Sequence, residues 1–275
     1  MAVENTIRGL KPEDLHSAME LSIHAGWNQT IQDWQRLLQL APNGCRAIYS
    51  GGTVAATTTR FDYGTRLAWI GMVLTRPEFR RQGLARRLME DAIVCAEEKG
   101  IRTLKLDATD FGRPLYESLG FVVEHTIERW EHAGTAQSAS RMDIPLALGE
   151  GLLKLDNESF GAKRNELLQD LARSGARTVA VDGYVLSRMG RVGRYLGPCV
   201  AASAESAQAL IKTHVTSLAE TGMWCWDLDP GNVYAVRCAE KLGFVRKRVL
   251  FRMRRGDEVP VNRAMTFASA GFEVG

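Results

Sequence analysis

The feature of this sequence that most limits its fold is an internal repeat. The segment ESLGFV at residues 117–122 recurs as EKLGFV at residues 240–245, 123 residues later. A predicted strand ending in aspartate and a short helix precede each copy, and an alternating strand follows it. Because the order of elements also matches, two chance occurrences of a common helix terminator are the weaker explanation. The sequence therefore predicts two domains of one fold, over residues 1–145 and 150–275.

Length and composition agree with two modest globular domains. The chain has 275 residues, of which 45% are hydrophobic and 24% are charged. Domains commonly hold roughly 100–200 residues, so this length suits two domains or one large one. The apolar content excludes a disordered chain, which could not bury enough surface to fold. The formal net charge of +3 is too small to indicate nucleic acid as a partner.

The cysteines and the amino-terminal residues predict a cytoplasmic protein. The five cysteines are scattered and lack the close spacing of a zinc or redox motif. The first residues do not have the basic, apolar and small-residue order of a signal peptide. The longest apolar run falls far short of the ~18 residues that span a bilayer. We expect a protein that binds no membrane and no metal, as a monomer or weak homodimer.

The first half predicts a mixed sheet flanked by helices. Strands are expected over residues 45–49, 54–60 and 67–74, and glycine-containing turns between them indicate antiparallel pairing. Residues 83–100 form an amphipathic helix, with apolar residues on one face and charged residues on the other. A strand over residues 103–106 follows, which makes a β-α-β unit with a parallel crossover. The predicted class is α/β (α+β), with a mainly antiparallel central sheet in each domain.

An arginine-rich segment joins the strand over residues 67–74 to the amphipathic helix. Residues 76–87 contain five arginines around Gly83 and Ala85. Small residues let the backbone approach a ligand, and a helix start offers unpaired N–H groups at the positive end of its dipole. The segment therefore predicts a pyrophosphate cradle whose arginines reach further phosphates. It lacks the Gly-Lys-Ser/Thr of a P-loop and the three glycines of a Rossmann turn. A solvated helix start is the alternative.

The order of these elements resembles the GNAT acetyltransferase superfamily over roughly residues 5–132. The first family motif, Q/R-x-x-G-x-G/A, is matched by Arg80, Gly83 and Ala85, and residues 115–121 (LYESLGF) end the later helix. The whole-chain pattern is similar to the tandem acetyltransferases of the YitH type. The resemblance implies acetyl-CoA as cosubstrate and transfer of an acetyl group to a primary amine of a small molecule.

The resemblance also implies where the cofactor is held. Backbone amides of the loop and helix start are expected to bind the pyrophosphate. A bulge in the preceding strand is expected to bind the pantetheine and the acetyl carbonyl. Many members carry an asparagine before the later helix, where this chain has residues 110–114 (DFGRP). The expected cofactor contacts are Met72, Val73, Leu74, Arg80, Arg81, Gln82, Gly83, Leu84, Ala85, Arg86, Thr109 and Gly112.

Tyr116 is the expected proton donor for the departing thiolate, since similar enzymes point a tyrosine of this helix at the sulfur. A phenol with a pKa of about 10 can share a proton with a thiol in the transition state. A packed helix tyrosine is the structural alternative. Asp107, at the end of a central strand, is the candidate base for the amine. His24 and His125 are further candidates, and each of these three residues could instead be structural or solvated.

Trp27 and Asn28 are the candidate residues for the acceptor amine. With Trp34, they fall in the helical segment that caps the acceptor side in similar enzymes, although aromatic residues near helices often belong to the core. A nucleic-acid acceptor or partner is not expected, because aromatic residues are not interleaved with the arginine clusters.

The second copy departs from the first where the chemistry is expected. Ala239 stands at the position of Tyr116, and residues 203–208 (SAESAQ) replace the phosphate loop with no glycine and no arginine. Glu205 would repel phosphate. We expect the second domain to lack cofactor binding, and the first to act as an acyl-CoA-dependent N-acyltransferase by direct attack in a ternary complex. A non-catalytic acyl-CoA-binding sensor or regulatory module is the alternative, and Tyr116 argues against it.

Overall fold

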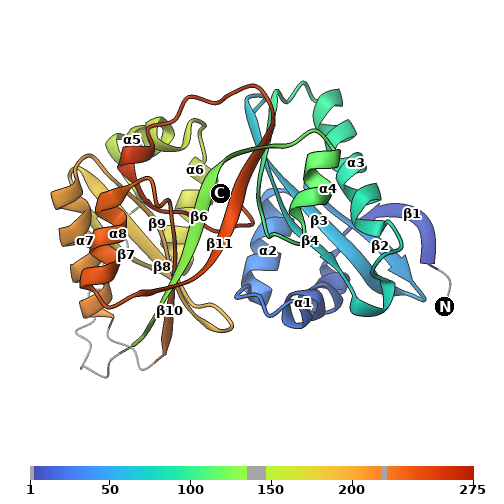
Figure 1. Cartoon of the computed structure of the whole chain (residues 1–275), viewed down its shortest axis with the longest axis horizontal. Helices are drawn as coiled ribbons and strands as arrows, with labels where there is room; N and C mark the ends of the chain where they lie inside the picture. The colour runs from blue at the N-terminus through green and yellow to red at the C-terminus, as the bar shows by residue number, and fades with distance from the viewer. Residues whose placement is uncertain (1–2, 135–146, 219–221) are drawn as a thin grey trace. The chain divides into compact units, whose positions relative to one another are not determined.

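The computed structural model of the chain describes residues 3–134, 147–218 and 222–275 (Figure 1). These residues form two compact units. Unit one comprises Met1–Val123, Met253–Glu258 and Phe272–Gly275, and unit two comprises Glu124–Arg252 and Val259–Gly271. Residue 145, the predicted end of the first domain, lies outside the described residues. Because neither unit is continuous in sequence, the predicted division at residues 145–150 stays a prediction.

Unit one contains the predicted mixed sheet. β1, β2, β3 and β4 pair antiparallel in this order, and β4 pairs parallel with β5, which confirms the predicted β-α-β unit. Gly51 and Gly52 have positive φ angles, so a tight turn joins β2 to β3 as predicted. The elements are β1 (Val3–Gly9), α1 (Leu15–His24), α2 (Ile31–Leu40), β2 (Cys45–Ser50), β3 (Thr53–Tyr63), β4 (Leu67–Thr75), α3 (Leu84–Glu98), β5 (Thr103–Ala108) and α4 (Arg113–Ser118), with short 3-10 helices at Pro12–Asp14, Pro42–Gly44 and Pro77–Phe79.

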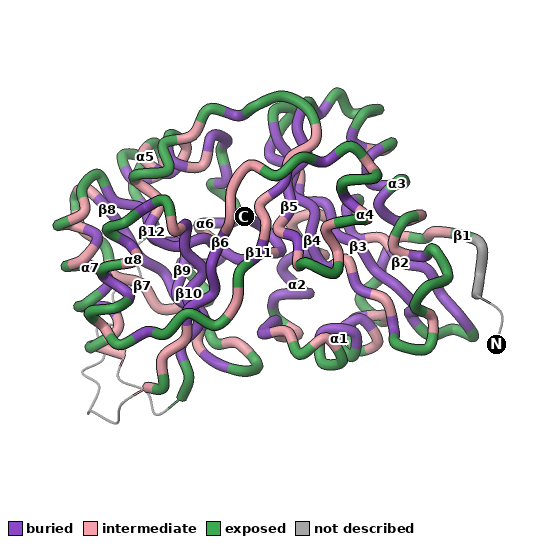
Figure 2. Tube along the Cα trace, viewed as in Figure 1, coloured by how far each residue is buried: buried purple, intermediate pink, exposed green. Residues whose placement is uncertain are grey.

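Burial follows the predicted pattern in unit one. β3 and β4 are buried along most of their length (Figure 2). Leu84 and Leu88 on the apolar face of α3 pack with Ile48 and Ala56 of the sheet. Removing this apolar surface from water is what holds the helix on the sheet. The predicted helix over residues 83–100 is confirmed, since α3 spans Leu84–Glu98.

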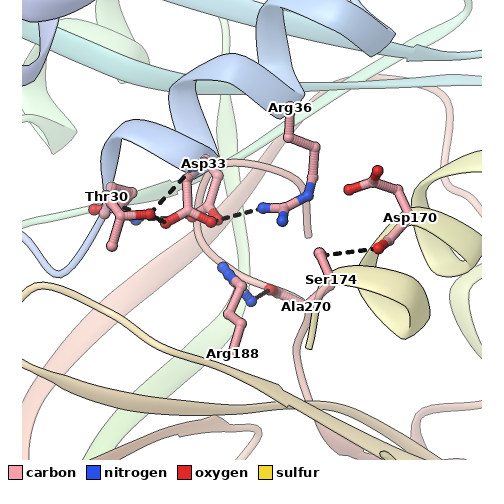
Figure 3. Close-up of polar contacts among 9 residues, drawn as sticks. Thr30, Asp33, Arg36, Asp170, Ser174, Arg188 and Ala270 are labelled. Carbon is pink, nitrogen blue, oxygen red and sulfur yellow. Dashed lines mark hydrogen bonds and ion pairs between the residues drawn. The ribbon is translucent and has the colours of Figure 1, made fainter. Parts of the chain in front are cut away.

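The connection between α1 and α2 is fixed by a capping box at the start of α2. The Thr30 hydroxyl accepts the Asp33 N–H at 3.3 Å, and the Asp33 carboxylate accepts the Thr30 N–H at 2.9 Å (Figure 3). The guanidinium of Arg36 donates to the same carboxylate at 2.7 Å. Such reciprocal bonds satisfy donors that a helix start otherwise leaves unpaired. The residues just before Thr30 are therefore held in a defined place.

Unit two repeats the order of elements of unit one. β7, β8 and β9 pair antiparallel and β9 pairs parallel with β10, as β2 to β5 do. This repetition confirms the two-copy fold predicted from the sequence. The elements are β6 (Val122–Ala133), α5 (Glu150–Phe160), α6 (Asn165–Ser174), β7 (Ala176–Ala180), β8 (Gly183–Arg188), β9 (Gly193–Ala201), α7 (Ala204–Ser217), β10 (Met223–Leu228), α8 (Val233–Lys241), β11 (Val245–Gly256) and β12 (Thr266–Ala268), with a 3-10 helix at Arg263–Met265.

The strand that follows α4 in sequence belongs mainly to unit two. From Glu124 onward β6 is part of that unit, where it pairs antiparallel with β10 from Met223 opposite Ala133 to Leu228 opposite Glu128. The end of β11 belongs instead to unit one, and so does Asp257 just after the strand, whose carbonyl accepts the Thr103 hydroxyl at 2.9 Å. Each unit therefore takes strand residues from the other half of the sequence. Among the described residues, no helix combines the length and apolar content needed to cross a membrane.

Because unit two contains a buried histidine, we expect this unit to lose stability in acid. His214 on α7 is 1% exposed, and its ring nitrogens lie 2.9 Å from the Thr178 hydroxyl and 2.8 Å from the Ser187 hydroxyl. Burial lowers the pKa of His214 to about 3. The unfolded chain takes up this proton below about pH 6.5, whereas the folded chain does not, so the free energy of unfolding should fall by about 1.4 kcal/mol per pH unit between these values.

Denaturant unfolding at pH 7, 6 and 5 checks this prediction. His214→Gln keeps hydrogen-bonding groups and removes the titrating ring, so the variant should show a shallower loss of stability over the same range. An identical pH dependence in both proteins would assign the acid sensitivity to other groups.

Candidate functional site

β4 contains a bulge at the place where the family resemblance implies one. In the register of β3 and β4, Thr57 lies opposite Leu74 and Thr59 opposite Gly71, so β4 carries one extra residue. Met72 within this bulge has a φ of +49°, which is unusual for a residue with a side chain. The Thr57 hydroxyl donates to the Met72 carbonyl at 2.8 Å in a buried position. The bulge is thus held by a specific bond, and a strained backbone of this kind often marks a functional site.

Among the described residues, β4 pairs with β5 ahead of the bulge, with Ala68 opposite Leu104 and Trp69 opposite Lys105. Residues 72–74 lie beyond these pairs, with Met72 and Leu74 buried and Val73 half-buried. That the strand splays here and offers backbone groups of residues 72–74 to a ligand stays a prediction.

The start of α3 is open. Gly83 precedes the helix with a φ of +77°, and among the described residues no side chain caps this helix start. A Cβ built on Gly83 would meet no described atom within 4 Å. The backbone bonds of the helix begin with the Arg87 N–H, which donates to the Gly83 carbonyl at 3.1 Å. The amides of Leu84, Ala85 and Arg86 therefore lie outside that ladder and can bind an anion.

Arg81 has a φ of +60° in the turn before this helix. Met72 and Arg81 are the non-glycine residues with positive φ in the described part of the chain. Both belong to the set that the resemblance assigns to the cofactor. Backbone strain therefore coincides with the predicted site in two separate segments.

The arginines of residues 76–87 divide into structural and exposed ones. Arg76 is 7% exposed, donates from Nε to the Val54 carbonyl at 2.7 Å and pairs with Glu20. It holds the loop to unit one and has no surface to offer a phosphate. Three others are exposed, namely Arg80, Arg81 and Arg86, and so is Gln82. The guanidinium of Arg86 donates to the Ser118 hydroxyl at 2.8 Å, which joins the start of α3 to the end of α4.

Tyr116 is a buried phenol on α4. Its side chain is 8% exposed and its ring lies edge-on to Phe121, with centroids 6.2 Å apart. A Cβ on Gly112 would be only 3.1 Å from the Tyr116 ring, so Gly112 makes room for it. The Thr109 hydroxyl accepts the Gly112 N–H at 3.2 Å and shapes the turn into α4. Burial raises the pKa of Tyr116 well above its usual value, so the phenol stays protonated at neutral pH.

The structure separates the candidate bases. Asp107 is half-buried near the end of β5 in unit one. His24 is exposed at the end of α1. His125 lies in β6 within unit two, where its Nε2 is 3.9 Å from Asp229. Of these candidates, Asp107 and His24 belong to the unit that contains the β4 bulge.

The candidate acceptor residues follow α1. Trp27 is half-buried and Asn28 is 7% exposed, both in the connection to α2. Trp34 is fully buried, and its indole N–H donates to the Ser22 hydroxyl at 3.0 Å. Trp34 therefore packs in the core between α1 and α2, which is the structural alternative considered for it.

Unit two retains a bulge but not the other features. Val185 lies opposite Cys199 and Ser187 opposite Leu196, which leaves Gly197 and Pro198 as the bulge of β9. Proline has no N–H to offer a ligand. α7 begins with Ser203, whose hydroxyl accepts the Ser206 N–H at 3.1 Å and so caps the helix. Pro198 is itself a signal in the sequence, since a proline inside a strand removes a hydrogen-bond donor.

Residues Phe272–Gly275 also belong to unit one, and the sequence predicted no role for them. The Trp69 indole donates to the Phe272 carbonyl at 3.0 Å, and the Tyr63 hydroxyl donates to the Val274 carbonyl at 2.6 Å. These bonds lay the segment along β3 and β4 beside the bulge. No motif in residues 270–275 (AGFEVG) predicts that this segment contacts β3 and β4.

Comparison with known proteins identifies the family of both units. A family model described as an acetyltransferase (GNAT) domain matches residues 43–123, and a second model of the same description matches residues 152–268. The chain belongs to the GNAT acetyltransferases. It contains two GNAT domains in tandem and is an N-acetyltransferase. The predicted family and fold class are therefore confirmed.

Relatives and solved structures agree with this assignment. The chain is 27% identical over 225 residues to the uncharacterized N-acetyltransferase YitH of Bacillus subtilis, covering 77% of this chain and 78% of YitH. It is 32% identical over 157 residues to the ribosomal protein bS18-alanine N-acetyltransferase of Escherichia coli, covering 52% of this chain and 99% of that enzyme.

Two solved structures share the fold along the whole chain. A putative acetyltransferase from Pyrococcus horikoshii has a TM-score of 0.85 at 20% identity and covers 98% of this chain and 95% of its own. A tandem GNAT protein from the clavulanic acid biosynthesis pathway has a TM-score of 0.62 at 14% identity and covers 93% of this chain and 98% of its own. At these identities the likeness is one of fold.

Proposed function

We propose that unit one transfers an acetyl group from acetyl-CoA to the primary amine of a small molecule by direct attack in a ternary complex. The observation that carries this proposal is the continuity between the bulge of β4 at Met72 and the uncapped start of α3 at Gly83. One stretch of backbone thus offers donors to an acyl carbonyl and, a few residues later, to a pyrophosphate. The reaction is expected in the cytoplasm, with the protein as a monomer or weak homodimer.

The loop and helix start would bind the pyrophosphate through backbone amides from Gln82 to Arg86, while the exposed side chains of Arg80, Arg81 and Arg86 neutralise phosphate charge. The backbone of Met72, Val73 and Leu74 would bind the pantetheine arm and polarise the acyl carbonyl. Thr109 and Gly112 complete the cofactor side at the entry to α4. Trp27 and Asn28 line the acceptor side.

Bound acetyl-CoA supplies a thioester whose carbonyl carbon accepts an amine and whose sulfur leaves as a thiolate. Tyr116 is the proposed acid for that sulfur, because burial keeps its phenol protonated. A proton held at the Tyr116 hydroxyl would lower the energy of the departing thiolate. Unit two is not proposed to bind acetyl-CoA, since Pro198 lacks an N–H and Ser203 caps α7.

The test is release of CoA in the presence of an amine panel, followed with a thiol reagent. The panel contains an alkylamine, a polyamine, a free amino acid and a peptide with an amino-terminal alanine. The peptide is included because the Escherichia coli relative is a ribosomal protein bS18-alanine N-acetyltransferase. At least one amine should accelerate CoA release about tenfold or more over hydrolysis and gain the mass of an acetyl group. Tight binding of acetyl-CoA without release for any amine would contradict the proposal.

Gly83→Ala is expected to weaken acetyl-CoA binding about tenfold and to lower the free energy of unfolding by about 1 kcal/mol. The stability loss follows from the φ of +77° at this position. The loss of affinity follows because the added methyl would occupy the space in front of the helix amides. Calorimetric titration with acetyl-CoA and denaturant unfolding measure the two effects.

Gly100→Ala is the matched control at the other end of α3. Gly100 has a φ of +67°, and a Cβ there would also meet no described atom within 4 Å. This variant should lose similar stability and keep its affinity for acetyl-CoA. Equal affinities for Gly83→Ala and the wild type would remove the helix start from the site.

A further inference from the structure

A buried carboxylate lies against β4 one residue before the bulge. Glu273 is 3% exposed, and its Cα is so close to Gly71 that a Cβ on the glycine would lie 2.6 Å away. The neighbouring carbonyls of Phe272 and Val274 accept the bonds from Trp69 and Tyr63 described above. Three successive residues are thus fixed on the sheet, and Glu273 is held beside the backbone proposed to receive the acyl group.

One polar group with unused bonding capacity contacts this carboxylate, and a second lies opposite Gly71 on the neighbouring strand. Gln29 is 8% exposed, and its Nε2 donates to the Glu273 carboxylate at 2.8 Å, while its Oε1 is buried with no hydrogen-bond partner among the described residues. Thr59 stands directly opposite Gly71 in the register, so it shares that face of the sheet, and its hydroxyl is also buried and unpartnered. A buried polar atom left unpaired is costly, and a fold tolerates that cost where a ligand binds.

These groups match one kind of ligand. An amide oxygen, a hydroxyl and a carboxylate accept hydrogen bonds, and a primary ammonium carries three N–H donors and a positive charge. The capping box at Thr30 and Asp33 fixes the residue that follows Gln29, and the Gln29 amide is held by its bond to the Glu273 carboxylate. Gln29 and Glu273 fall outside residues 43–123 and 152–268, so neither family match assigns them a role.

We propose that Gln29, Thr59 and Glu273 form the subsite for the acceptor's ammonium group and that Glu273 takes its proton. This inference rests on the proposed acetyl transfer. The Glu273 carboxylate accepts one proton from the ammonium, and the freed nitrogen lone pair forms the C–N bond with the acyl carbon. The C–S bond breaks, and the sulfur takes its electron pair and the Tyr116 proton. The surplus proton on the new amide nitrogen restores the phenol, and Glu273 releases its proton to solvent.

The first test measures binding without turnover. n-Butylammonium chloride should bind the wild-type protein saturably in calorimetric titration, and n-butanol, which has the same chain and no charge, should not. Glu273→Gln should weaken that binding about tenfold or more and leave the acetyl-CoA affinity unchanged. Thr59→Val, which nearly preserves the shape of the side chain, is the second variant and should also weaken the binding of n-butylammonium.

The matched control is Glu97→Gln, which removes another carboxylate of unit one, paired with Arg255 at 2.8 Å. No saturable binding to the wild type would overturn the proposal.

The second test separates proton removal from positioning. n-Butylamine arrives protonated at neutral pH, whereas hydroxylamine arrives as a free base. Glu273→Gln should lower kcat/KM for n-butylamine about a hundredfold and for hydroxylamine only a few-fold. An equal loss for both amines, or a selective loss in Asp107→Asn instead, would overturn the assignment of Glu273 as base. If the wild type releases no CoA with any amine, the acetyl transfer fails, while the binding test still decides the ammonium subsite.

Discussion

Replacing Tyr116 with phenylalanine is expected to lower kcat about a hundredfold or more while leaving the Kd for acetyl-CoA nearly unchanged. The reason is that the change removes one hydroxyl and keeps the ring, which packs edge-on to Phe121 and fills the space above Gly112. A general acid acts when the C–S bond breaks, so its loss should appear in turnover. Burial raises the Tyr116 pKa, so the wild-type phenol is available as an acid throughout the neutral range.

Steady-state kinetics with an amine from the panel and calorimetric titration with acetyl-CoA check this expectation. Tyr49→Phe is the control, because Tyr49 is 4% exposed and its hydroxyl donates to Asp14 at 2.7 Å. It removes a buried phenolic hydroxyl of the same unit and should keep kcat. An unchanged kcat in Tyr116→Phe would return Tyr116 to the role of a packing residue. Equal losses of kcat and affinity would indicate a collapsed α4.

Most of the fold could be predicted from local patterns in the sequence. The period of apolar residues gives α3, the glycine pair at residues 51–52 gives the turn between β2 and β3, and the repeated LGF gives the tandem organisation. The glycine pair and the helix period each lie within one short stretch of the chain, and the repeat is recognised because both of its copies are short and similar. The proposed phosphate loop rests on the same kind of signal, since Arg80, Gly83 and Ala85 fall within one short segment.

Contacts between distant parts of the sequence were not predictable. Arg76 belongs to the same arginine cluster as Arg80, and only its bond to Val54 and its pairing with Glu20 show that it is structural. The approach of Gln29 to Glu273 joins residues 244 positions apart. No spacing rule links such residues, because side chains far apart in sequence meet only after the sheet has formed. The exchange of β6 and the end of β11 between the units has the same origin.

The largest expected effect on stability concerns β6, the strand that unit two takes from the first half of the sequence. Asp227→Asn should lower the free energy of unfolding of unit two by about 3–5 kcal/mol, because it leaves the Arg129 guanidinium buried without its counter-charge. Arg129 of β6 lies directly opposite Asp227 of β10, and its Nε donates to the carboxylate at 2.6 Å. Asp227 is 0% and Arg129 6% exposed. Burial opposes the charge of Arg129, and the Asp227 carboxylate outweighs it, so the pKa of Arg129 lies above its usual range.

The double variant Arg129→Met/Asp227→Leu separates the charge from the strand pairing. Apolar residues of similar size should restore most of the lost stability, since a buried pair is often replaceable when both charges leave together. The control is the exposed pair of Arg113 and Glu117, which has the same 2.6 Å separation but side chains 40% and 43% exposed. Glu117→Gln should cost less than about 1 kcal/mol, because solvent screens the pair. Hydrogen exchange along β10 locates the effect. A small loss in Asp227→Asn, or faster exchange in α3 of unit one instead, would show that β6 does not hold unit two together as its pairing with β10 indicates.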